Sequence, residues 1–152
     1  DDYSNLITAR TNNSSIDYLK KMITDKEIIP IDLKKSNTDI YKNTLHLDCC
    51  FQTIANDKAI ICPDGFKSKK DVDFLINYFG ESNVFVANPE ETFQLTSNVL
   101  VVSPDVIISN VKFNRLNSWL ENKGVLVEEV DYSNVSKMSG LFRCSTLPLK
   151  RE

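Results

Sequence analysis

The sequence predicts an α/β fold built from a repeated strand–strand–helix–strand unit. Two observations lead to this prediction. Short β-rich runs bounded by turn residues alternate with amphipathic stretches of helical period, and the same order of elements then occurs a second time. One such unit cannot bury its apolar face alone, so the units are expected to stack or to close into a ring.

The first complete unit opens with two predicted strands, residues 45–54 (LHLDCCFQTI) and 58–66 (KAIICPDGF). Ser68 is then expected to cap a helix over residues 69–80, and a third strand is predicted over residues 82–89 (SNVFVANP). Apolar residues at helical spacing share one face of this helix: Val72, Leu75, Ile76 and Phe79.

The second unit repeats the order, with predicted strands over residues 98–103 and 105–110 on either side of the turn residue Pro104. A helix is expected over residues 111–124 and a third strand over residues 125–130. The apolar face of this helix again has helical spacing: Phe113, Leu116, Trp119 and Leu120.

An incomplete copy precedes these two units, with a predicted strand at residues 5–9, a helix at 14–23 and a strand at 27–33. A trailing strand is predicted over residues 140–149 (GLFRCSTLPL). The polar stretch 34–44 is expected to be a long loop in front of the only histidine. No linker divides the chain, which favours a single domain.

The composition of the chain argues against some classes of binding partner. The chain has 152 residues and carries 18 basic against 21 acidic side chains, a net charge of −3 without a basic block, which argues against nucleic acid. No apolar run approaches the roughly 18 residues of a membrane span, and no signal segment opens the chain. Four cysteines without a C-x-x-C motif suggest neither a disulfide framework nor a zinc ribbon, and favour a reducing cytoplasm.

His46 is the only histidine and lies two residues before an acid. In a strand, His46, Asp48 and Cys50 would share one face, with about 7 Å between the first two. Spacing alone leaves open that His46 is a hydrogen-bonded core residue and Asp48 a turn or edge residue. A metal site is disfavoured because a single histidine would need carboxylates or scattered cysteines as its co-ligands.

The cysteines differ in their predicted surroundings. Cys49 would face the apolar side of the strand and Cys62 lies in a β-rich run, so both are expected to be small core residues. Cys50 shares the predicted face of His46 and is therefore a candidate reactive thiol.

Cys144 has a different context, because Arg143 precedes it and Gly140 lies close by. A neighbouring cation and an open strand end favour an ionised, accessible thiol. A cysteine–histidine pair need not be close in sequence, because the fold brings the two together. Cys144 and His46 are thus a candidate catalytic pair.

Three segments carry a family resemblance. LHLDCCF resembles the His-x-Asp motif of the guanidino-group-modifying superfamily, which contains arginine deiminases, dimethylarginine dimethylaminohydrolases and amidinotransferases. SGLFRCSTLPLKR is similar to the C-terminal nucleophile motif of that superfamily, and ITARTNNSSIDYL resembles its RTN segment. The repeat is similar to its five-unit ββαβ propeller. The resemblance implies an α/β-propeller (pentein) fold, with about three of the five units present.

The resemblance also implies roles for individual residues. Cys144 would be the nucleophile, His46 the general acid and base, and Asp48 the carboxylate that holds a guanidinium group. Independently of the resemblance, Arg143 is expected to bind either a substrate carboxylate or a structural acid. No metal or organic cofactor is required.

The implied activity is hydrolysis of the guanidino group of arginine or an arginine derivative through a covalent thiouronium. Alternatives are transfer of the amidino group to an amine and, from a different class, a non-catalytic binding protein on the same fold. The expected substrate is a small guanidino or ureido compound.

Two departures from the superfamily pattern affect the expected extent of the chain. Ser139 stands where a glycine often precedes Gly140. The E-G-G-type segment, which supplies a carboxylate that orients the histidine, is absent from residues 1–152 and precedes the RTN segment in other members. Residues 1–152 are therefore interpreted as the C-terminal portion of a single catalytic domain. The N-terminal half of the same propeller, in the same or a companion chain, is expected to complete it.

Overall fold

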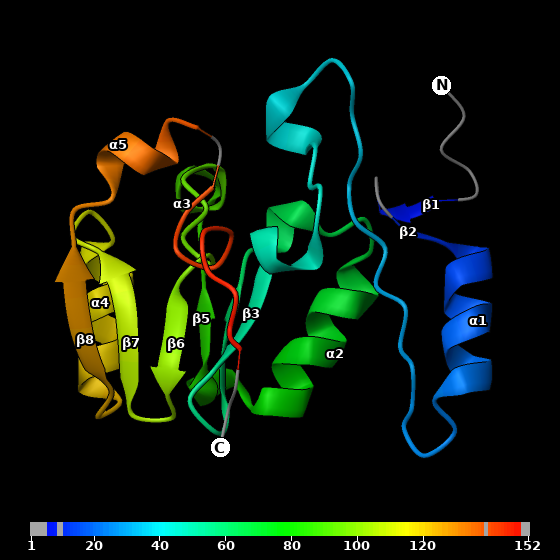
Figure 1. The fold of residues 1–152 in the computed structure, drawn as a ribbon, viewed down its shortest axis with the longest axis horizontal. Helices are drawn as coiled ribbons and strands as arrows, with labels where there is room; N and C mark the ends of the chain where they lie inside the picture. Colours follow the sequence, from blue (N-terminus) through cyan, green and yellow to red (C-terminus); the bar gives the residue numbers. More distant parts are fainter. Residues whose placement is uncertain (1–5, 9–10, 139, 150–152) are drawn as a thin grey trace.

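The computed structural model describes residues 6–8, 11–138 and 140–149. Its main body consists of two units that stand side by side (Figure 1). The first unit contains β3 (Phe51–Ile54), β4 (Lys58–Ile61), α2 (Lys69–Phe79) and β5 (Val84–Val86). Strand β3 pairs antiparallel with β4, and β4 pairs parallel with β5 across the helical crossover. This is a complete ββαβ unit.

The second unit has the same topology. It contains β6 (Leu100–Ser103), β7 (Val106–Asn110), α4 (Asn114–Asn122) and β8 (Leu126–Val130). Strands β6 and β7 are antiparallel, and β7 and β8 are parallel. The predicted repeat is confirmed, and each unit forms its own three-stranded sheet.

The N-terminal piece is smaller and lies apart from the two units (Figure 1). Strands β1 (Leu6–Thr8) and β2 (Thr11–Asn12) form a short antiparallel pair, and α1 (Asn13–Met22) follows. The Asn12 side chain caps α1 by accepting a hydrogen bond from the Ser15 N–H. No residue of α1 is buried, so this helix does not contribute to the apolar core.

The predicted strand over residues 27–33 does not form. Only Leu33 takes part in sheet-like pairing, through an isolated bridge to Phe66. Pro30 lies in the middle of this run and has no N–H to donate to a ladder. The segment is therefore an extended connection that enters the first unit at Leu33, which is fully buried.

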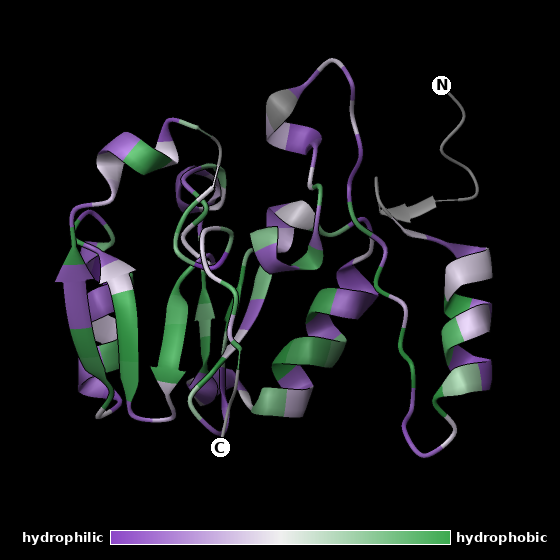
Figure 2. Cartoon of the chain, in the orientation of Figure 1, coloured by the Kyte–Doolittle hydropathy of each residue, from purple (hydrophilic) through white to green (hydrophobic). Residues whose placement is uncertain are grey.

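The two predicted amphipathic helices are confirmed. Ser68 caps α2 by accepting from the Lys70 N–H, and Val72 and Leu75 lie buried beneath the helix. The same inward apolar face occurs on α4 through Leu116 and Leu120. Hydrophobic residues concentrate on the sheet strands and on these helix faces (Figure 2).

Two further strand predictions were wrong, one in part and one entirely. In residues 45–54 the strand begins only at Phe51, and Leu47–Cys49 form one turn of 3₁₀ helix instead. Residues 140–149 contain a turn rather than a strand, closed by the Ser145 N–H donating to the Leu141 carbonyl. Two short helices, α3 (Pro89–Phe93) and α5 (Ser133–Ser136), were not predicted from the sequence. The remaining 3₁₀ turns are Ile40–Lys42, Pro63–Gly65 and Glu81–Asn83.

A single apolar core runs through both units. Arg115 of α4 links the units at the surface: its guanidinium lies 4.1 Å from the centre of the Phe85 ring and donates to the Val86 carbonyl at 2.7 Å. It also pairs with Glu91 of α3. The largest fully buried apolar side chains are Phe85, Leu33, Ile54, Ile60, Ile61, Ile107, Leu116, Leu120 and Leu141. Within the described ranges, no helix is long and apolar enough to cross a bilayer.

Candidate active site

The candidate site begins with the loop that enters β3. The ligand atoms of His46, Asp48 and Cys49 all lie within 4.8 Å of one another. The turn Leu47–Cys49 produces this cluster, because the Cys49 N–H donates to the His46 carbonyl and folds the chain back on itself. An imidazole, a carboxylate and a thiol therefore occupy one small region at the end of the sheet.

The predicted faces of the two adjacent cysteines were wrong. Cys50 is fully buried rather than beside His46, and its Cβ packs so closely on Gly65 that a Cβ at that glycine would lie 2.4 Å away. Cys49, expected in the core, is instead half-buried beside Asp48. The cause is the 3₁₀ turn, which replaces the two-residue alternation of a strand and rotates both side chains.

Cys144 lies in the turn after Gly140 and is exposed. A Cβ added at Gly140 would lie 3.1 Å from the Cys144 Cβ, so the chain passes very close to the nucleophile candidate at this point. The Leu141 carbonyl accepts from both the N–H and the hydroxyl of Ser145. These contacts fix the turn while leaving the Cys144 side chain accessible.

Two residues that the sequence analysis missed connect the His46 loop to Cys144. The Ser97 hydroxyl donates to the Asp48 carbonyl at 3.0 Å. The adjacent Asn98 side chain donates to the Cys144 Sγ at 3.1 Å and accepts from the Cys144 N–H at 3.2 Å. Ser97-Asn98 is thus a bridge between two motifs that are distant in sequence.

The repeat contained a signal for this bridge. Ser97-Asn98 leads into β6, the first strand of its unit, as the His46 loop leads into β3. Neutral Ser and Asn at such a place resemble ordinary turn residues, and only their position in the repeat distinguishes them.

The thiols have different electrostatic surroundings. Burial raises the pKa of Cys62 to about 11, and burial likewise raises the pKa of Cys50. Burial is also the main reason that the pKa of Cys49 is raised, and negative charge on Asp48 and Cys144 raises it further. Cys49, Cys50 and Cys62 therefore remain neutral thiols near pH 7.

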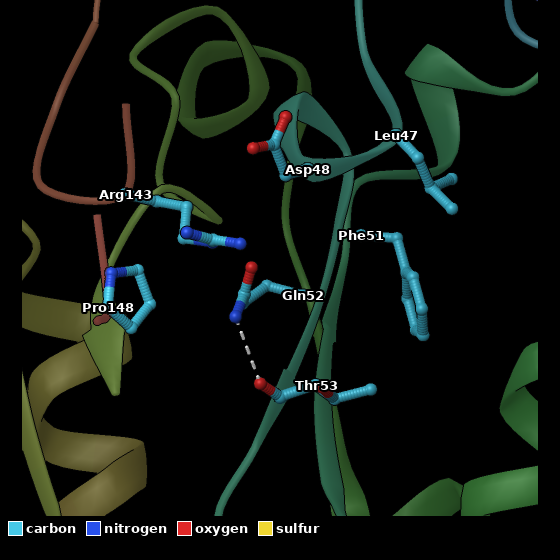
Figure 3. A pocket seen from close by; sticks show the side chains of 7 residues that line it. All are labelled: Leu47, Asp48, Phe51, Gln52, Thr53, Arg143 and Pro148. Carbon is cyan, nitrogen blue, oxygen red and sulfur yellow. Dashed lines mark hydrogen bonds between the residues drawn. The ribbon is translucent and has the colours of Figure 1, made fainter. Parts of the chain in front are cut away.

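A cleft of about 380 Å³ opens beside this region (Figure 3). Asp48 contributes a carboxylate and Arg143 a guanidinium to its wall. Among the described residues, these two opposite charges form no ion pair with each other. The cleft therefore presents one anionic and one cationic group. Its lining residues are Leu47, Asp48, Phe51, Gln52, Thr53, Arg143 and Pro148.

The structure thus brings together most of the predicted site. His46 and Asp48 lie in one cluster, Asp48 and Arg143 line one cleft, and Cys144 is tied to this region through Asn98. In the described residues, the set that can hold a metal ion is His46, Asp48 and Cys49. These are a mixed set of one nitrogen, one oxygen and one sulfur donor.

Comparison with known proteins identifies the family of the chain. The family model described as arginine deiminase matches residues 68–151, more than half of the chain. YkgA of Bacillus subtilis is 30% identical over 145 residues, which cover 95% of this chain and 47% of YkgA. The arginine deiminase of Treponema denticola is 26% identical, over 96% of this chain and 43% of its own length. The chain spans about half the length of the curated relatives it matches.

Solved structures show the same fold. ArgZ, an arginine dihydrolase from the ornithine–ammonia cycle in cyanobacteria, matches with a TM-score of 0.72 and 21% identity over 88% of this chain and 20% of ArgZ. SxtG, an amidinotransferase of Microseira wollei, matches with a TM-score of 0.71 and 21% identity over 93% of this chain and 42% of SxtG. The chain therefore belongs to the arginine deiminase family and has part of the α/β-propeller (pentein) fold.

Proposed function

We propose that this chain supplies the nucleophile, the general acid and base, and the guanidinium-binding acid of an amidine hydrolase. The observation that carries the proposal is the bridge at the entrance to β6. Ser97 holds the loop of Asp48, and its neighbour Asn98 holds Cys144. Two consecutive residues thus join the thiol to the cluster of imidazole and carboxylate, although local sequence would not bring these groups together.

The reaction follows from the chemistry of these groups. The Cys144 thiolate attacks the central carbon of the guanidinium and forms a tetrahedral adduct. His46 gives a proton to the departing amine, the carbon–nitrogen bond breaks, and a covalent S-alkylthiouronium remains. His46 then takes a proton from water, which attacks the same carbon, and the Cys144 thiolate leaves. Arginine would yield ammonia and a ureido product.

The two charged residues that line the cleft favour a substrate with a positive charge at one end and a negative charge at the other. Asp48 can accept two parallel N–H bonds from a planar guanidinium, while Arg143 can pair with a carboxylate. Since both line the same cleft without pairing with each other, a small guanidino acid such as arginine fits this arrangement. In this proposal, recognition of the substrate rests on Asp48 and Arg143, and the chemistry on Cys144 and His46.

The same proposal includes a companion segment. The curated relatives are about twice as long as this chain, and we propose that residues 1–152 form the C-terminal portion of one propeller whose N-terminal portion completes the site. That portion would supply the carboxylate that orients His46. Loss of the equivalent acid in a serine-protease triad lowers the rate by about 10⁴, so the chain by itself is expected to be almost inactive. Co-purification with the N-terminal portion and assay with and without it tests this expectation.

The activity is tested on the longest native polypeptide that contains this chain. Arginine, methylated arginines, agmatine and citrulline are screened for release of ammonia, amine or urea, with and without an amine acceptor. Acid quenching followed by mass spectrometry should show the thiouronium adduct on the Cys144 peptide. Cys144→Ala should abolish product and adduct, whereas Cys62→Ala, a buried thiol elsewhere in the core, should retain both.

The screen also separates the alternatives. A product that forms only with an amine acceptor would identify an amidinotransferase, the activity named for SxtG. Absence of any adduct or product would favour a non-catalytic binding protein. An active Cys144→Ala variant would refute the proposed mechanism.

A further inference from the structure

Asn98 contacts Cys144 with both ends of its amide. The side chain is fully buried at the entrance to β6, whereas Cys144 is exposed. Its Nδ2 lies 3.1 Å from the Cys144 Sγ, and its Oδ1 lies 3.2 Å from the Cys144 backbone nitrogen. The two residues are 46 positions apart, so the tertiary fold creates this pair of contacts.

The backbone of Cys144 determines which way the amide faces. A backbone N–H is only a donor, so the atom of Asn98 opposite it must be the oxygen. The amide nitrogen is then forced toward the sulfur and donates a hydrogen bond to it. Such a bond is stronger to a thiolate than to a neutral thiol, because the acceptor carries the charge.

The surroundings explain why a neutral donor is useful here. Asp48 and Cys49 lie in the adjoining loop, and negative charge on Asp48 disfavours a second negative charge close by. A lysine or arginine in the place of Asn98 would compete with the substrate guanidinium for Asp48. A buried amide supplies a donor to sulfur without adding a charge.

We propose that Asn98 is the thiolate-stabilising residue of this site: it holds the Cys144 turn by the backbone and donates a hydrogen bond to the attacking sulfur. The proposal rests on the proposed function, in which Cys144 is the nucleophile. It assigns to the second unit a direct contact with the reacting atom, although that unit has no ionisable side chain at its entrance.

The test measures how the reactivity of the Cys144 thiol depends on pH in the absence of substrate. Alkylation of Cys144 by iodoacetamide is followed by peptide mass spectrometry between pH 5 and 10 in wild type, Asn98→Ala and Asn98→Asp. A hydrogen bond to a charged group corresponds to a factor of roughly ten or more. Asn98→Ala should therefore move the midpoint of the pH–rate profile up by about one pH unit, and slow alkylation about tenfold at neutral pH. Asn98→Asp, which keeps the acceptor but puts an oxygen against the sulfur, should move the midpoint at least as far.

Asn117→Asp is the matched control. Asn117 is also a buried asparagine of the second unit, and it bonds to the Asn110 carbonyl and to Glu129 rather than to a thiol. This variant should be less stable but should have the same pH–rate profile for Cys144 alkylation as the wild type. Circular dichroism identifies which variants are folded. If one Asn98 variant does not fold, the other still gives the measurement.

The outcomes separate this proposal from the proposed function. A wild-type profile in a folded Asn98 variant would overturn the role of Asn98, whatever the activity on arginine. A shifted profile in a protein that turns over no guanidino compound would support the contact between Asn98 and the thiolate while refuting the proposed hydrolase.

Discussion

The two ββαβ units have the same topology but differ in how their third strand is covered. By the parallel register, Val84 of β5 and Leu126 of β8 occupy equivalent positions. Val84 is 6% exposed, whereas Leu126 is 57% exposed. Trp119 and Arg115 of α4, in the following unit, contact Phe85 of β5, whereas no further ββαβ unit follows β8 within the described residues. The burial of a third strand therefore depends on whether another unit packs beside it.

The units also differ at the entrance to their first strand. The loop before β3 carries an imidazole, a carboxylate and a thiol, whereas the loop before β6 carries a hydroxyl and an amide. The first set can exchange protons, and the second can only hold other groups in place. In the proposed function, the loop before β3 thus provides the chemistry and the loop before β6 supports it. Substitutions in the two loops test this division.

The largest difference is expected between His46 and Ser97, which precede β3 and β6 respectively. His46→Ala should lower the rate of the proposed guanidino hydrolysis by about 10²- to 10⁴-fold, because it removes the proposed general acid and base. Ser97→Ala removes one neutral hydrogen bond to the Asp48 carbonyl and should cost less than about tenfold. Steady-state kinetics on the longest native polypeptide measures both. Equal losses would refute the division between chemistry and support.

Within the first unit, Asp48 is compared with Asp64, since each acid lies in a 3₁₀ turn of this unit. Asp48→Asn retains the shape but loses the charge that pairs with a guanidinium, so KM should rise roughly 10- to 100-fold. The unfolding transition should change little. Asp64→Asn should leave KM unchanged, because Asp64 does not line the cleft. An unaltered KM in Asp48→Asn would remove Asp48 from substrate binding.

The difference in burial between the two units can also be tested by comparing the stability of two variants. Ile61 of β4 and Ile108 of β7 are equivalent by register, but Ile61 is fully buried and Ile108 only partly. Ile61→Ala should lower the free energy of unfolding by about 2–5 kcal/mol. Ile108→Ala should cost less, because less apolar surface returns to water. Urea unfolding of both variants provides the measurement, and a larger loss at Ile108 would contradict the burial argument.

The sequence predicted the repeat well because local pattern determines it. Alternating β-rich runs became β3 to β8, and the apolar faces of α2 and α4 followed helical spacing. The short helix α3 was also predictable, since Asn88 and Glu91 form a capping box, but five residues give too little periodicity to be noticed.

The site was less predictable because tertiary contacts overrode local pattern there. Residues 45–50 alternate like a strand, yet the close contact of Cys50 with Gly65 accompanies a turn that rotates the two cysteines. Asn98 had no local signal, because its contact with Cys144 depends on how the units are arranged. The roles proposed for His46, Asp48 and Cys144 come from the family resemblance, because spacing alone left those roles open.

The smallest expected effect concerns the ion pair between the units, Glu91 with Arg115. The hydrogen bond from Arg115 holds the pKa of Glu91 below its usual range. A carboxyl with a lowered pKa stabilises the fold above its ordinary pKa, and this contribution is lost as the pH falls through the lowered value. Glu91→Gln can retain the capping bond to Asn88 while losing the charge, and should cost about 0.2–1 kcal/mol at pH 7, since the Arg115 side chain is 53% exposed.

The pH dependence distinguishes this ion pair from a general packing effect. The difference in unfolding free energy between wild type and Glu91→Gln should be full at pH 6–7 and should shrink below about pH 4, where glutamate protonates. Thermal unfolding across this range measures it. Glu90→Gln is the control, because Glu90 precedes Glu91 in α3 but bonds only to the Gln94 amide. A Glu91 effect that is constant with pH, or matched by Glu90→Gln, would show that the contact between units is made by packing of Arg115 on Phe85 rather than by charge.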